Sequence, residues 1–166
     1  MEGMRLTKNV AVRPGPAATL EELYRAEYVG MVRLAFTLIG NNAEAEEIVQ
    51  DSFVEVSRRL DDTRGRIERP GAYLRTIVVS RSNSVLRRRR VIGHHPPERP
   101  ADLTPEADEL WDVLDRLTEH QRIAVVLKFY CGYRAHEIGK IVDQPAATVR
   151  SHLRRAMATM RKELTS

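Results

Sequence analysis

Cysteines, aromatic residues and long apolar runs are scarce in this sequence, and each scarcity excludes a class of protein. The 166 residues contain one cysteine, Cys131, so neither an intramolecular disulfide nor a Cys/His metal set can form, which fits a reducing compartment. Aromatic residues make up 5% of the chain, which favours two small domains over one large core. No segment approaches the roughly 20 apolar residues of a membrane span. We therefore expect a soluble, cytoplasmic protein that does not insert into a membrane.

Enzyme motifs are missing as well. The sequence has no nucleophile elbow, no glycine-rich phosphate-binding loop and no carboxylates placed to converge on a substrate. His94 and His95 are adjacent, but no further metal ligand lies near them in the sequence. We therefore disfavour a hydrolase or nuclease and expect no catalytic residue, no cofactor and no metal.

Charged residues, by contrast, are abundant. Lys and Arg number 27 against 23 Asp and Glu, which gives a formal net charge of +4 and a pI near 9.5. Such a balance favours a polyanionic partner, and nucleic acid is the first candidate.

Residues 117–156 have the pattern of a helix-turn-helix. Thr118 and Gln121 form a capping box at the start of the first helix, and Gly132 suits the left-handed position after it. Pro145 cannot continue the second helix but suits the first turn of the third. In that third helix Val149, Leu153 and Ala156 share the inward face. The outward face carries Thr148, Arg150, Ser151, His152, Arg154 and Arg155, a set that can contact phosphates and base edges.

An acidic helix is predicted near the middle of the N-terminal half. A capping box at Thr19 and Glu22 begins the ordered chain, and Gly40 ends the first helical stretch. The next helix, residues 43–60, turns Ile48, Val49, Phe53 and Val56 inward and shows a stripe of carboxylates at Glu44, Glu47, Asp51 and Glu55. Taken alone, such a stripe is typical of a solvated surface.

An arginine-rich segment follows. Residues 61–71 form a charged loop that holds Arg64 and Arg66, and Pro70 opens a further helix. Its inward stripe is Leu74, Ile77, Val78 and Val85, with Tyr73, and its other face carries Arg75, Thr76, Ser80, Asn83 and Arg87. Four consecutive arginines at positions 87–90 repel one another, so a phosphate backbone is the partner that explains them best.

The predicted fold is all-α, with two small helical domains joined by a flexible linker. We expect a disordered tail at 1–18, one domain at 19–91, a Pro-rich linker at 92–105 and a helix-turn-helix domain at 106–166. After the linker, Leu110, Trp111, Val113, Leu114 and Leu117 are expected to pack a helix onto the last three. The free domains are expected to move about the linker.

The order of these motifs resembles that of the two-domain, extracytoplasmic-function (ECF) sigma factors of the sigma-70 family, and the variants are similar to actinobacterial members. The segments that carry the resemblance are AEEIVQDSFVEV (45–56), RPGAYLRTIVVS (69–80), LRRRR (86–90), LTEHQRIAVVLKFYCGY (117–133) and HEIGKIVDQPAATVRSHLRRA (136–156). Each is weak alone, and together they are specific.

The resemblance implies a non-catalytic subunit that binds core RNA polymerase and directs promoter recognition and opening. It implies that the clamp helices of the polymerase are bound by Glu44, Glu47, Gln50 and Asp51. It implies that one base of the minus-10 element is flipped out of the duplex. The residues that would bind this element are Arg64, Arg66, Tyr73, Arg75, Ser80, Asn83 and Arg87. It implies that the minus-35 element is bound by Thr148, Arg150, Ser151, His152, Arg154 and Arg155. The same C-terminal domain would contact the polymerase flap. An anti-sigma factor is a further possible partner.

Four positions depart from the pattern of related chains. Ser80 stands where asparagine is frequent in related chains, and Ser84 stands where they commonly have an aspartate. Gly139 replaces a usual alanine, and His152 replaces a usual arginine. These changes bear on promoter specificity rather than on polymerase binding. The alternative is a stand-alone helix-turn-helix regulator whose N-terminal module serves for dimerisation or sensing.

Overall fold

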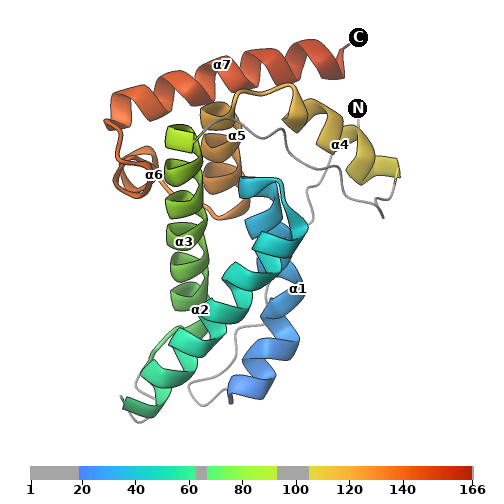
Figure 1. Ribbon diagram of the computed structural model, residues 1–166. Coiled ribbons are helices and arrows are strands. Elements are labelled where there is room, and N and C mark those ends of the chain that lie inside the picture. Colours follow the sequence, from blue (N-terminus) through green and yellow to red (C-terminus); the bar gives the residue numbers. More distant parts are fainter. Residues whose placement is uncertain (1–18, 63–66, 93–104, 166) are drawn as a thin grey trace.

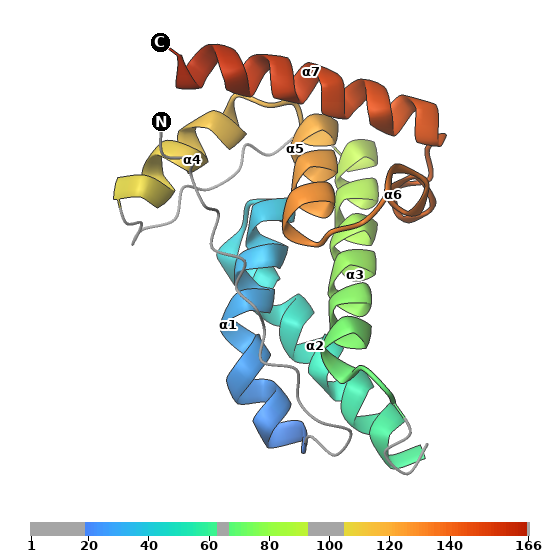
Figure 2. The same ribbon diagram turned by 180° about the vertical axis from the view of Figure 1, so that it is seen from behind.

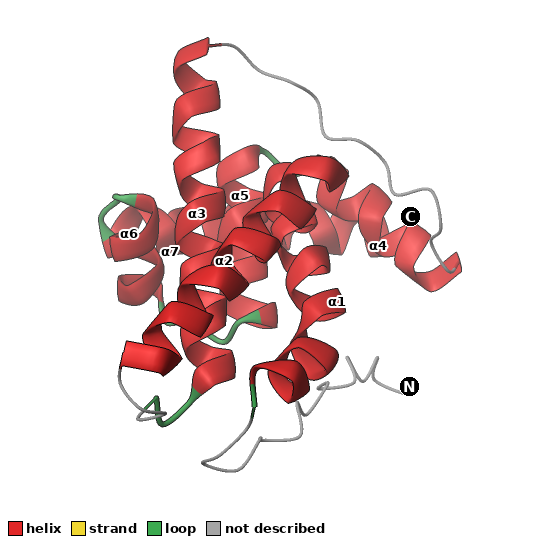
Figure 3. Ribbon diagram, turned by 60° about the horizontal axis from the view of Figure 1, so that its bottom comes forward, coloured by secondary structure: helices red, strands yellow, loops and turns green. Residues whose placement is uncertain are grey.

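The computed structural model describes residues 19–62, 67–92 and 105–165, and these parts are helical without strands (Figures 1 and 3). The predicted all-α class is confirmed. The elements are α1 (Leu20–Ile39), α2 (Asn42–Asp62), α3 (Pro70–Ile92), α4 (Pro105–Asp115), α5 (Glu119–Val125), a π-helical turn η1 (Val126–Tyr130), α6 (Ala135–Val142) and α7 (Ala146–Leu164). The predicted tail, most of the linker and the residues Arg64 and Arg66 lie outside the described residues. None of the described helices is both long and apolar enough to cross a bilayer.

The N-terminal module is a bundle of α1, α2 and α3, which pack against one another (Figure 1). The predicted capping box at Thr19 and Glu22 is present, and Gly40 ends α1 in the left-handed conformation with φ 71°. The four residues predicted to face inward from α2, namely Ile48, Val49, Phe53 and Val56, are all buried. Each such side chain contributes about 1.5–3 kcal/mol when it is fully buried, so this face of α2 is fixed toward the bundle.

The C-terminal module contains α4 to α7, with α7 lying across its outer edge (Figure 1). The capping box at Thr118 and Gln121 is present, and Gly132 has the expected positive φ, 76°. The first helix of this motif ends at Cys131, directly before Gly132, as predicted. The widening of α5 into η1, where the Cys131 amide donates to the Val126 carbonyl at 3.2 Å, was not predicted. Tyr130, the last residue of η1, is 56% exposed.

The two modules are in contact. Helix α6 lies beside α3 in both views (Figures 1 and 2). The Trp111 ring of α4 stacks on Phe36 of α1 with centroids 5.1 Å apart, a contact that the sequence did not predict. The expected packing of α4 onto the last helices is confirmed at Leu114 and Leu117, which cluster with Val125 and Ala156. Leu110, expected in the same contact, is 40% exposed. One hydrophobic cluster therefore runs from α1–α3 into α6 and α7, and includes Ile138 and Val149.

Candidate nucleic-acid and protein interfaces

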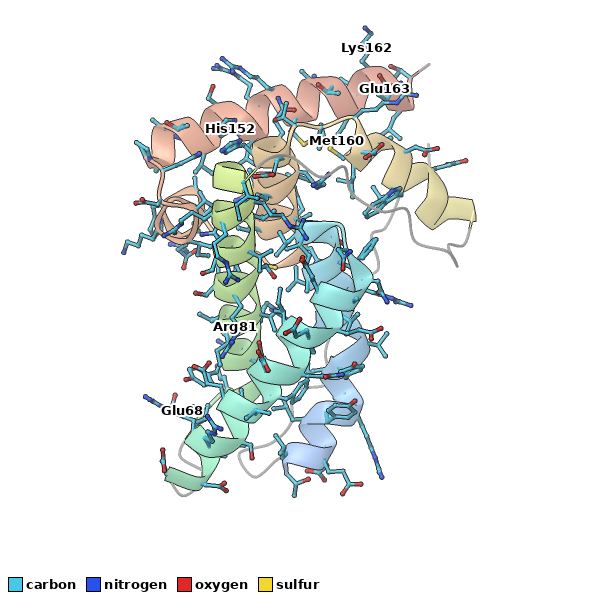
Figure 4. The ribbon with its side chains drawn as sticks, viewed as in Figure 1. Glu68, Arg81, His152, Met160, Lys162 and Glu163 are labelled. Carbon is cyan, nitrogen blue, oxygen red and sulfur yellow. The ribbon has the colours of Figure 1, made fainter. Side chains whose placement is uncertain are left out.

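The outer face of α7 is the most basic helix face of the C-terminal module. Val149 and Ala156 are buried and fix which side of the helix faces inward. Arg150, Arg154 and Arg155 are consequently exposed, while Thr148, Ser151 and His152 are half-buried at the edges of that face. The basic character continues to the C-terminal turn, where Lys162 points away from the other helices (Figure 4). Guanidinium groups on an exposed helix can pair with phosphates or with the major-groove edge of guanine.

The His152 side chain of α7 packs against α5, the helix behind it. Its ring stacks on that of His120 in α5, with centroids 5.3 Å apart and planes 20° from parallel. Burial, and after it the positive charge of Arg155, lower the pKa of His152 below its ordinary value. The imidazole is therefore mainly neutral at pH 7, in a position where an arginine would be charged.

The turn before α7 is unusually tight. Asp143 adopts the left-handed conformation with φ 55°, and the Gln144 amide donates to the Gly139 carbonyl at 2.9 Å. A Cβ added to Gly139 would lie 2.4 Å from the Gln144 carbonyl oxygen. Gly139 is thus required by the closeness of two backbone segments, which explains why alanine is absent from this position.

The carboxylate stripe of α2 is partly paired with arginines of α3. Glu47, Gln50 and Asp51 are exposed, and Glu44 is half-buried. Arg81 lies where α3 meets α2 (Figure 4), 2.8 Å from a Glu55 carboxylate oxygen and 3.7 Å from an Asp51 carboxylate oxygen. Some carboxylates of the stripe are therefore paired with arginines of α3, whereas Glu47 is exposed to solvent and in no ion pair that the structure records.

Arg89 is a structural arginine within the basic run. Its guanidinium donates to the Ile39 carbonyl at 2.5 Å and to a carboxylate oxygen of Glu44. The Ile39 carbonyl belongs to the last turn of α1, where helices leave acceptors without a partner. The interpretation of all four arginines as phosphate ligands is wrong for Arg89, whereas Arg87 is exposed. Sequence spacing gives no signal for either arginine, because Arg81 and Arg89 lie 26 and 45 residues from Glu55 and Glu44.

The predicted minus-10 face of α3 is only partly open. Ser80 and Arg87 are exposed, Tyr73 and Arg75 are half-buried, and the Tyr73 ring lies beneath the Arg59 guanidinium at 6.0 Å. Asn83 was expected on the outward face, but it is 8% exposed. Its side-chain amide donates to the Ile141 carbonyl of α6 at 2.5 Å, because α6 covers this part of α3. No cluster of three potential metal ligands occurs among the described residues.

Comparison with protein families matches both modules. Residues 23–91 match the family model "Sigma-70 region 2", and residues 107–160 match "Sigma-70, region 4". The chain belongs to the sigma-70 family. Region 2 thereby corresponds to the bundle of α1–α3 and region 4 to the module of α4–α7, in the order that the sequence motifs indicated. The stand-alone regulator does not account for the region 2 match.

Curated sigma factors match most of the chain. The RNA polymerase sigma-E factor of Streptomyces coelicolor is 29% identical over 157 residues, covering 90% of this chain and 88% of that protein. The ECF RNA polymerase sigma factor SigE of Mycolicibacterium smegmatis is 29% identical over 161 residues, covering 87% and 61%. SigV of Bacillus subtilis is 27% identical over 139 residues, covering 80% and 83%. The resemblance to ECF sigma factors, actinobacterial ones included, is confirmed.

A solved sigma factor has the same fold. The sigma factor RpoE from Bartonella quintana, crystallised with the anti-sigma factor NepR, superposes with a TM-score of 0.59 at 20% identity. The match covers 87% of this chain and 96% of that one. At this identity the likeness shows that the two chains share a fold.

Proposed function

We propose that this chain is a specificity subunit of RNA polymerase, which binds the core enzyme, recognises a promoter and helps to open it, without catalysing a reaction itself. The observation that carries the proposal is an acidic face on α2 and a basic face on α7, in the two modules that match sigma-70 regions 2 and 4. The site of action would be the cytoplasm, where the polymerase works.

The domain roles follow from this division. Residues 19–91 would form the domain for core polymerase and the minus-10 element, 92–105 the linker, and 106–166 the domain for the minus-35 element and the polymerase flap. The exposed Glu47, Gln50 and Asp51, with Glu44, would face the clamp helices. The negative charge of Glu47 and Asp51 on a rigid helix suits a basic partner surface and would accelerate encounter.

The α3 face would capture the minus-10 element. A base that leaves the duplex costs a few kcal/mol in stacking and pairing, and the protein offsets this cost with a pocket and with positive charge near the backbone. Tyr73, Arg75, Ser80, Asn83 and Arg87 supply ring, hydrogen-bonding and cationic groups of this kind. Arg64 and Arg66 would add charge from the loop before α3.

The α7 face would read the minus-35 element in the major groove. Arg150, Arg154 and Arg155 project from one exposed side of the helix, flanked by Thr148, Ser151 and His152. This is the arrangement with which the last helix of a helix-turn-helix contacts base edges. An anti-sigma factor is a further proposed partner, since the related Bartonella protein was crystallised with one.

Run-off transcription tests the function directly. Purified core polymerase, a library of genomic fragments and the full chain are expected to give discrete start sites that core polymerase alone does not give. A chain that neither binds the core nor starts transcription anywhere in the library would contradict the proposal. Binding of a palindromic duplex by the chain alone would point to the stand-alone regulator instead.

Substitutions on α7 test the minus-35 assignment. We expect Arg150→Ala and Arg154→Ala each to weaken recognition of the upstream element by about 5- to 150-fold, because one bidentate pair contributes ~1–3 kcal/mol. Core affinity should stay unchanged. The measurement is promoter-fragment binding by the reconstituted holoenzyme. Arg161→Ala is the control, because Arg161 is exposed on the same helix, seven residues or more beyond these positions. Equal losses in all three variants would contradict a base-reading role.

A further inference from the structure

Two stacked histidines join two helices of the C-terminal module. His120 lies in the first turn of α5, and His152 lies on α7 over that turn (Figure 4). The ring centroids are 5.3 Å apart and the planes are 20° from parallel, which is an aromatic stacking geometry. Both side chains are half-buried. The stack therefore connects α5, to which the proposed function gives no DNA contact, with the helix that would enter the major groove.

His152 lies at the edge of the side of α7 that is proposed to face DNA. Thr148 precedes it by four residues and Arg155 follows it by three, so the three side chains lie along one side of the helix. The ring of His152 is thus held by α5, although its position belongs to the face proposed for the minus-35 element.

The space beneath the stack is apolar. The two rings border a small pocket between α5, α6 and α7, which is lined also by Ile123, Ile138 and Val149. These three side chains are buried. A ring that turned into this pocket would leave its nitrogens without hydrogen-bond partners, which is costly in an apolar environment. The pocket thus opposes an inward turn of the His152 ring, and the stack restricts the remaining orientations.

An imidazole at this position differs from an arginine in freedom and in chemistry. Arginine carries its charge on a long side chain and can pair two donors with guanine. Burial and the charge of Arg155 lower the pKa of His152, and a neutral imidazole has one donor and one acceptor nitrogen. Which base edge these nitrogens meet depends on the rotamer of the ring. A stacked aromatic pair favours one rotamer by about 2- to 10-fold over those that lack the contact.

We propose that His120 is a positioning residue for DNA recognition: its ring fixes the orientation in which His152 faces the major groove, and the pair thereby sets the base preference at one position of the minus-35 element. The inference rests on the proposed function for the role of α7. The contact between the two rings is testable without polymerase or DNA.

Nuclear magnetic resonance of the histidine rings tests the stack. The chain has five histidines, so the carbon-bound ring protons of His152 can be identified by their loss in His152→Ala. The ring current of His120 displaces these signals, and His120→Ala should return them to the values of an unstacked imidazole. His136→Ala, which removes an exposed histidine of α6, is the control and should leave them in place. His152 signals that do not respond to His120→Ala would overturn the stack.

Selection of promoter fragments by the reconstituted holoenzyme tests the positioning. The fragments carry a promoter found by run-off transcription, with its upstream element randomised. His152→Ala identifies the base pair that His152 reads, as the pair whose preference is lost. His120→Ala should lower the preference at that pair alone by about 2- to 10-fold, the range of the lost stacking. His136→Ala should keep the wild-type preference, and core affinity should stay unchanged in all three variants.

Two conservative variants separate the ring from its hydrogen-bonding groups. His120→Phe keeps an aromatic ring and should restore most of the base preference. His120→Gln keeps polar groups without a ring and should behave like His120→Ala. A preference retained in His120→Gln and lost in His120→Phe would overturn stacking as the cause.

The double variant His120→Ala with His152→Ala separates positioning from direct contact. Once His152 is absent, removal of His120 should have no further effect on base preference, because the two residues act as a coupled pair. Additive losses, or an equal loss of binding to every fragment in His120→Ala, would overturn the inference, as would an unchanged preference in His152→Ala. Failure of the proposed function would appear differently, as the absence of discrete start sites with core polymerase and the wild-type chain.

Discussion

The double substitution Glu47→Lys and Asp51→Lys is expected to lower the affinity for core polymerase by roughly 100-fold. Each reversal removes an attraction and adds a repulsion of like charges, and charge pairs at a protein interface contribute about 1.5 kcal/mol or more each. Both side chains are exposed, and Asp51 keeps only a 3.7 Å approach to Arg81, whose closer partner is Glu55. The helical fold should therefore survive the change.

The matched control for this variant is Asp61→Lys with Asp62→Lys. These residues are exposed at the C-terminal end of the same helix, so the change in net charge is identical, and a positive charge there suits the helix dipole. Binding of each variant to immobilised core polymerase gives the affinities, and circular dichroism gives the helix content. Similar losses in the two double variants would mean that net charge, and not the α2 stripe, governs the affinity.

Local signals in the sequence predicted the helices well. The capping boxes at Thr19 and Thr118 and the left-handed glycines at 40 and 132 depend on residues within one turn, and all four are present. The buried and exposed faces of α2 also follow from spacing alone, because a helix of fixed period has a fixed set of neighbours. These features required no knowledge of the partner elements.

The packing of α4 onto the last helices through Leu114 and Leu117 was predicted, but most other contacts between elements were not. Arg81 and Arg89 pair with carboxylates of another helix, and Asn83 binds a backbone carbonyl 58 residues away. A side chain on a polar helix face has the same sequence pattern whether it faces water or another module. For this reason the packing of Trp111 onto α1 and the masking of Asn83 could not be predicted from the sequence, although the family and its two regions could.

The structure also separates the two kinds of arginine in the basic run. Arg89 completes the C-terminal turn of α1 and neutralises Glu44, so it stabilises the region 2 bundle. Arg87 is exposed on the face proposed for DNA. The structural role of Arg89 and the DNA contact proposed for Arg87 thus lie within one helical turn, and each arginine has to be assigned from its own contacts.

Gly139→Ala is expected to destabilise the C-terminal module and to disturb the position of α7. The added Cβ would lie 2.4 Å from the Gln144 carbonyl oxygen, which is backbone and cannot swing aside, so the turn itself must move. Overpacking of this kind costs about 1–3 kcal/mol or more, against a gain of up to ~1 kcal/mol because alanine favours a helix over glycine.

The control for this variant is Gly30→Ala, where the new Cβ would meet the Tyr130 hydroxyl at an acceptable 3.8 Å. The same chemical change should therefore stabilise the chain at position 30 and destabilise it at position 139, as measured by the free energy of unfolding in urea. Because the turn sets the direction in which α7 leaves α6, promoter-fragment binding by holoenzyme carrying Gly139→Ala should fall as well. A variant as stable as wild type, with unchanged binding, would show that the turn relaxes freely and that this glycine does not set the orientation of the recognition helix.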